Sequence, residues 1–236
     1  MLMKRFFFLP LFSVFVLAVS AQSKVGTLSF IPKVGVNLSN VSGSDIMFAV
    51  QQNAVNASPK YKAGFAGGAE FEYQLQPQYS LSLGVLYSLQ GCRYKDISDA
   101  IAGKAGQYTG YSNMAMNLHY MQVPLLFSGY VAPGLAIKAG LQAGFLLEGK
   151  TKYDETKFIV NRDGGTVYDT PYPVSIDIKP TFHTFDMAIP LGISYEYGHV
   201  VMDARYNFPL TKAEKEIGSK NKCFTFSVGY KFEILR

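Results

Sequence analysis

Large apolar residues alternate with small or polar residues along much of this chain. In residues 79–91, for example, Leu81, Leu83 and Val85 alternate with Ser82 and Gly84. A period of two is the pattern of a β-strand whose two faces meet different surroundings. The same alternation predicts eight strands, at residues 29–39, 62–75, 79–91, 118–131, 135–148, 182–197, 199–210 and 223–234.

The connections between these strands are long and short in turn. The short ones are residues 76–78, residues 132–134 and Gly198, and the long ones are residues 40–61, 95–114, 149–181 and 211–222. Each predicted strand is at least as long as the roughly 9–11 residues that a tilted strand needs to cross a bilayer. This pattern predicts an all-β fold, an eight-stranded antiparallel up-and-down transmembrane β-barrel with short periplasmic turns and long extracellular loops.

The third long connection contains a predicted hairpin. Residues 158–169 place two short arms on either side of Asp163-Gly164-Gly165, a sequence that favours a tight turn. Each arm is too short to cross a bilayer. We therefore expect a flap above the barrel, with a ten-stranded barrel as the alternative.

The less apolar face of the predicted strands carries many Gly and Ser residues and isolated charges. A soluble sandwich would have longer, more Lys-rich polar faces, whereas the interior of an eight-stranded barrel has room only for packed side chains. We therefore expect the apolar face to meet lipid and the other face to fill the lumen. The expected lumen charges are Lys33, Glu70, Glu72, Lys138, Glu148, Asp186, Glu196, Asp203, Arg205, Lys231 and Glu233.

Opposite charges inside such a lumen can pair, so that none is buried alone. We therefore predict a structural ion network that plugs the barrel. The alternative for these charges is a narrow pore that passes small solutes.

The first 21 residues have the features of a secretory signal peptide. Lys4 and Arg5 precede the apolar run of residues 6–19, and small residues indicate cleavage after Ala21. Residues 22–236 then form one outer-membrane β-barrel domain. The whole chain has a net charge of +5, and removing the two basic residues of the signal leaves +3. So mild a charge on an exported protein argues against a nucleic-acid partner.

The chain carries no hydrolase, metalloprotease, dithiol or phosphate-loop motif. His119 and His183 share the lipid-facing phase near the loop-side rim, and we interpret them as interfacial residues rather than as catalytic residues acting on a lipid. No Ser or Asp partner is expected on that face nearby, so we predict no enzyme activity. Cys92 and Cys223 lie on strands that are not neighbours, so we expect free thiols, with a disulfide as the alternative.

The long loops hold the remaining candidates for function. Exposed aromatic and polar loop residues often bind partners, and we expect a surface for a protein or other surface ligand at Tyr153, Tyr168, Asp169 and Tyr172, with Tyr108 and Tyr111 in the preceding loop. A weaker alternative is a calcium site formed by Asn161, Asp163 and Asp169. We expect no cofactor, no metal and a monomer surrounded by outer-membrane lipid.

Several segments carry a family resemblance. They are YSLQGCRYK (87–95), LHYMQVPLLFSGYVAPGLAIKAGLQAGFLL (118–147), FDMAIPLGISYEYG (185–198), DARYNFPLT (203–211) and TFSVGYKF (225–232). With these segments the chain resembles the PorT-like outer-membrane β-barrel family over nearly all of residues 22–236. The resemblance implies a single-domain barrel in the outer membrane of Gram-negative bacteria, and the founding member is associated with protein export to the cell surface.

One feature departs from the pattern of outer-membrane barrels, which often end in an aromatic residue. This chain ends in Phe-Glu-Ile-Leu-Arg, so Phe232 is the nearest candidate for an assembly signal. We expect a non-enzymatic integral outer-membrane protein that contacts a partner through its loops. A narrow channel is the second hypothesis and a lipid-modifying enzyme the third.

Overall fold

The computed structural model describes residues 23–50, 53–101, 106–161, 164–216 and 218–236. The predicted signal peptide, residues 1–21, lies outside these ranges and stays a prediction. Within them, no helix has the length and apolarity that a membrane crossing requires.

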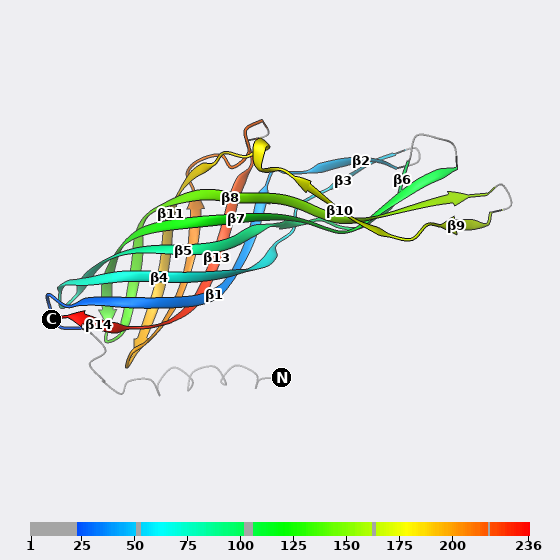
Figure 1. Cartoon of the computed structure of the whole chain (residues 1–236). Coiled ribbons are helices and arrows are strands. Elements are labelled where there is room, and N and C mark those ends of the chain that lie inside the picture. The colour runs from blue at the N-terminus through cyan, green and yellow to red at the C-terminus, as the bar shows by residue number, and fades with distance from the viewer. Residues whose placement is uncertain (1–22, 51–52, 102–105, 162–163, 217) are drawn as a thin grey trace, which may run out of the picture.

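Eight antiparallel strands pair into a closed ring (Figure 1). They follow one another around the ring in chain order, and the last pairs with the first, with Val228 opposite Val34. The ring therefore has the predicted number of strands, and the ten-stranded alternative is wrong. The ring strands are β1 (Leu28–Ser42), β4 (Lys62–Gln76), β5 (Tyr79–Arg93), β7 (Gln107–Ala132), β8 (Leu135–Val160), β11 (Phe185–Tyr197), β12 (Val200–Pro209) and β13 (Lys220–Tyr230), and β14 (Phe232–Leu235) pairs with β1.

Three of the segments expected to be loops contain strands instead. The additional strands are β2 (Ile46–Val50), β3 (Asn53–Ala57), β6 (Ile97–Ile101), β9 (Thr166–Tyr168) and β10 (Tyr172–Asp177). β7 and β8 each run for 26 residues, far beyond the predicted ends. Strict alternation is lost in these extensions because both of their faces carry polar residues, so the periodicity that identified the ring strands could not detect them.

The additional strands flank the extensions of β7 and β8 and form one projection from the ring (Figure 1). We call this projection the finger, and it comprises β2, β3, residues 97–101, 107–114, 150–160 and 166–177. The predicted hairpin is present, with Phe158 opposite Tyr168. Its first arm is the end of ring strand β8, so the hairpin continues the wall and is not a separate flap.

The two faces of the ring strands have the predicted polarity. On β5, Leu83 and Val85 are 52% and 54% exposed, whereas Ser82 is 1% exposed. Large apolar side chains are exposed in this way on all eight ring strands. So continuous an apolar outer surface is typical of a protein that lipid surrounds.

A β-bulge near the loop-side end of β8 changes which face its residues occupy. His119 pairs with Glu148, but the next residue, Tyr120, pairs with Leu146, so Leu147 is an extra residue in the ladder. Leu147 is exposed and Glu148 follows it outward, beside His119. The expected lumen position of Glu148 is therefore wrong, because one inserted residue reverses the phase of all residues beyond it.

Buried apolar side chains close the loop-side end of the ring. We call them the apolar plug, and its members are Val41, Ala57, Cys92, Tyr94, Ile97, Met114, Met116, Leu118, Tyr120, Leu146, Phe182 and Ala213. The sequence had predicted a wall strand from residue 182. In the structure that strand, β11, begins at Phe185, and Phe182 instead follows the short 3₁₀ helix η1 (Lys179–Thr181). The backbone N–H of His183 donates to the Ala213 carbonyl at 2.8 Å, which joins the two loops that supply Phe182 and Ala213.

Candidate functional site

Charged side chains from β1, β4 and β12 meet in the lumen of the ring. The Glu70 carboxylate lies 2.6 Å from the ammonium of Lys33 and 2.9 Å from the guanidinium of Arg205. Asp203 accepts a second hydrogen bond from Arg205 at 2.8 Å, and it lies 3.6 Å from Lys33. Two acids and two bases therefore form a closed group in which each carboxylate contacts both cations.

A second group of charges joins the first through Lys138. Its ammonium lies 3.7 Å from Asp203 and 3.6 Å from Glu72. Lys231 then lies 2.7 Å from Glu72 and 2.8 Å from Glu196. All eight side chains are at most 7% exposed. This ion network has four positive and four negative groups, so it fills the lumen without a net charge.

Glycines on the inner face give the ion network its space. A Cβ on Gly84 would lie 2.6 Å from Cγ of Glu70, and a Cβ on Gly229 would lie 2.7 Å from Cγ of Lys33. Both contacts are shorter than carbon atoms tolerate, so any larger residue at these positions would displace the charged side chain opposite. The small residues of the lumen face therefore position the ion pairs.

Besides Glu148, two of the eleven expected lumen charges do not belong to the ion network. Glu233 lies in β14, next to the chain end, where it pairs with Arg236. Asp186 faces the lumen, but it lies nearer the loop-side rim, above Gly144 of β8. The prediction that these two residues join the network is wrong. The alternation of residues shows which side chains face the lumen, but it does not show how far along the barrel axis they lie.

A polar cluster lies on the outer surface at the loop-side rim. Nδ1 of His119 lies 2.5 Å from the hydroxyl of Tyr87, and its Nε2 lies 3.7 Å from Glu148. Glu148 also contacts the ammonium of Lys150. The sequence had predicted no acidic partner for His119, and the bulge explains why Glu148 was missed. Tyrosine, histidine and lysine at this level fit the boundary between lipid tails and headgroups.

The four residues proposed as a loop binding surface lie in the finger, but not on one surface. Tyr168 is 67% exposed and Tyr172 43% exposed, and Asp169 is also exposed. Tyr153 instead packs against the apolar plug and makes an edge-on contact with Tyr111 at 5.6 Å between ring centroids. Tyr153 therefore supports the base of the finger, and the other three residues remain available to a ligand.

Aromatic rings form a row across the end of the finger. The rings of Tyr108 and Phe158 stack with centroids 5.4 Å apart, and Phe158 contacts Tyr168 at 5.1 Å. Tyr172 lies nearby on β10, where its hydrogen bond with Glu155 raises the pKa of the phenol. Phe158 was missed because nothing in the sequence shows that it lies between two tyrosines of other strands.

Both cysteines are free and buried. Cys92 belongs to the apolar plug, and Cys223 lies in the lumen, with its sulfur 3.7 Å from the hydroxyl of Thr225. No cluster of three or more His, Cys, Asp or Glu in the described ranges could hold a metal ion. Asp163, which the calcium alternative requires, falls outside those ranges.

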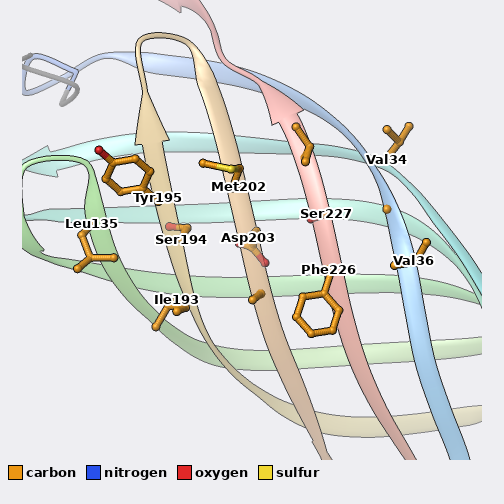
Figure 2. Close-up of a pocket in the computed structure, with 13 residues that line it drawn as sticks. Val34, Val36, Leu135, Ile193, Ser194, Tyr195, Met202, Asp203, Phe226 and Ser227 are labelled. Carbon is orange, nitrogen blue, oxygen red and sulfur yellow. The ribbon is translucent and has the colours of Figure 1, made fainter. Parts of the chain in front are cut away.

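A shallow hollow of about 580 Å³ lies on the outer surface of the ring, across β11, β12, β13 and β1 (Figure 2). Apolar side chains such as Val36, Ile193 and Phe226 surround it, and the small side chain of Ala204 forms part of its floor. The hollow is therefore part of the apolar outer surface, and its lining residues Ser194, Asp203 and Ser227 belong to the inward-facing phase of their strands.

Solved structures of small barrels are similar to this chain. Ail, the attachment invasion locus protein of Yersinia pestis, has 13% identity and a TM-score of 0.43, and the match covers 89% of this chain and 100% of that chain. The outer membrane protein OprG from Pseudomonas aeruginosa has 12% identity and a TM-score of 0.37, with 92% and 100% coverage. Neisserial surface protein A has 9% identity and a TM-score of 0.34, with 87% and 97% coverage.

A search of curated proteins finds no significant match. The family model described as "Outer membrane protein beta-barrel domain" matches residues 20–214, which is most of the chain. This match agrees with the closed ring, its apolar outer surface and its polar lumen. The chain therefore belongs to the outer-membrane β-barrel family and is a protein of the outer membrane.

Proposed function

We propose that this protein is a non-enzymatic, integral outer-membrane barrel whose finger contacts a partner protein. In this proposal the ring crosses the membrane as a monomer, the short turns face the periplasm, and the finger stands on the extracellular side. The barrel wall then serves as an anchor, and the part of the chain with a specific role is the finger.

The length of β7 and β8 is the observation that carries this proposal. Each strand has 26 residues, whereas a tilted strand crosses the hydrocarbon core with about 9–11. At about 3.3 Å per residue, the surplus of roughly 15 residues corresponds to about 50 Å of strand. A membrane cannot enclose this length, so both strands extend far into the aqueous phase.

The edges of the finger favour a protein as the partner. In the described residues, β3 and β10 lie at the two ends of the strand order and have a neighbour on one side only. Edge strands present unpaired N–H and C=O groups, which a strand from another protein can use to extend the sheet. The exposed side chains of Tyr168 and Tyr172 beside one of these edges would add contact area.

The filled lumen favours the role of a membrane anchor over that of a channel. The ion network and the apolar plug occupy the interior at two successive levels. An eight-stranded barrel is only wide enough for its own side chains, so a solute would have to displace both. The resemblance to the PorT-like proteins supports placing the partner among the proteins of surface export.

Site-specific crosslinking in intact cells tests the proposed function. A photoreactive amino acid at Ser175, an exposed residue of the edge strand β10, should crosslink to one partner protein. The matched probe at Gln78, in a short turn at the opposite rim, should not capture it. The same product at both positions would contradict a role specific to the finger.

A shortened finger provides the second test. Glu155 and Tyr172 lie directly opposite each other in the β8–β10 ladder, so an Asn-Gly turn can join them and replace residues 156–171. The shortened protein should still fold and reach the outer membrane, because the ring and the plug are unchanged. Retention of the Ser175 crosslink without Tyr168 would show that the β10 edge alone binds the partner.

A further inference from the structure

A small polar cavity lies in the lumen between the ion network and the apolar plug. Its volume is about 20 Å³, which is enough for one particle of the size of a water molecule. Asn207 lines it, two residues beyond Arg205 of the ion network, and Ala213 of the plug lines it from the other side. The cavity therefore lies among this chain's own side chains, between the two levels.

Asp186 supplies a carboxylate to this cavity. It lies opposite Gly144, which in turn lies opposite Gln122 on the next strand. A Cβ on Gly144 would lie only 2.1 Å from Oδ1 of Asp186. The glycine therefore allows the carboxylate to lie across β8, toward Gln122, which also lines the cavity.

No basic residue of the described chain pairs with Asp186. The four cations of the ion network are already balanced by its four acids. The group that interacts with its carboxylate is the phenol of Tyr120, which carries no charge. Asp186 is half-buried, and a carboxylate withdrawn from water without a positive partner is costly, so the cavity lacks one positive charge.

Two amide oxygens in the same cavity also lack a partner. Oδ1 of Asn207 and Oδ1 of Asn221 are buried without a hydrogen bond, and Asn207 as a whole is 4% exposed. The orientation of Asn221 is fixed because its amide nitrogen donates to Gln90 at 2.6 Å, and Gln90 donates to Ser88 at 2.7 Å. The unpartnered oxygen of Asn221 is therefore an acceptor, and both Asn207 and Asn221 line the cavity beside Asp186.

We propose that this cavity binds one dehydrated monovalent metal cation of the size of sodium, held by Asp186, Asn207 and Asn221. A set of ligands made of oxygens alone suits a hard cation. A single positive charge neutralises the single carboxylate, whereas a divalent ion would leave a net charge in a lumen of low dielectric constant. The cation would tie β11, β12 and β13 together just below the plug. This proposal does not depend on the role of the finger.

Thermal unfolding of the full-length protein in detergent micelles tests this site. Circular dichroism would be recorded in sodium chloride and in choline chloride at equal ionic strength, because choline is too large for the cavity. The unfolding midpoint should rise saturably with sodium, since a ligand that binds only the folded state stabilises it. The sodium-23 NMR line should be broader in the presence of the protein than in the same detergent buffer without protein.

Three variants separate the site from a general salt effect. Asp186→Asn should abolish both the midpoint shift and the line broadening, and Gly144→Ala should reduce them because its methyl group displaces the carboxylate. Glu216→Gln removes an exposed carboxylate from the loop between β12 and β13 and should retain both effects. An equal midpoint in the two salts, a response to calcium alone, or an unchanged sodium response in Asp186→Asn would overturn the proposal.

Discussion

Neutralising Glu70 should destabilise the barrel more than neutralising any exposed charged side chain. This carboxylate contacts Lys33 at 2.6 Å and Arg205 at 2.9 Å, and all three side chains are at most 4% exposed. Glu70→Gln leaves four buried cations with three acids. Removing one partner of a buried ion pair typically costs about 3–5 kcal/mol because the other charge stays buried without compensation.

Urea unfolding of the protein in lipid vesicles measures this loss of unfolding free energy. The comparison is valid if the slope of that free energy against urea concentration is the same in the variant and the unmodified protein. Glu233→Gln is the matched control, because this carboxylate lies outside the ion network and pairs with the exposed Arg236. The control should cost less than about 1 kcal/mol, as expected for surface ion pairs. A loss of similar size in both variants would refute the reasoning.

A double substitution shows whether the loss comes from imbalance of charge or from lost packing. Lys33→Met combined with Glu70→Leu removes one charge of each sign, so the remaining network has three of each. The double variant should lose several kcal/mol less than the sum of Lys33→Met and Glu70→Leu measured singly. Strict additivity would show that the two side chains do not interact across the lumen.

Three further outcomes follow from the ring and its lumen. Leu83→Arg, in the middle of the lipid-facing surface of β5, should cost about 2–4 kcal/mol, whereas Tyr168→Arg in the finger should leave urea unfolding unchanged. Planar bilayers containing the protein should show no steady single-channel currents, and regular conductance steps would contradict a filled lumen. Cys92 and Cys223 should react with a maleimide reagent only after denaturation, and an intact mass lower by two hydrogens would reveal a disulfide instead.

The alternation of residues was sufficient to predict the wall of the barrel. Leu83 is exposed and Ser82 buried because successive side chains of a strand point to opposite faces, and this rule needs no knowledge of the partner strand. The number of ring strands followed from counting such segments. Apart from its hairpin, the finger was not predicted in this way, because polar residues occupy both faces of the β7 and β8 extensions and the period of two disappears there.

The pairing of the charges needed the tertiary structure. Lys33 and Glu70 lie on paired strands, but Arg205 is far away in the chain and meets them only because the ring closes through β13 and β1. The alternation showed that Asp186 faces the lumen like the residues of the ion network. It could not show that Asp186 lies nearer the loop-side rim, beside different neighbours.

The sequence by itself determined the β-strands, their two faces and the kind of side chain that fills the lumen. These are local properties, because each depends only on the period of the residues within one strand. The tertiary structure decided the closure of the ring, the outward position of Glu148 and the joining of Phe182 with Ala213 in the plug. Each of these depends on register between strands, and register is a relation between distant parts of the chain.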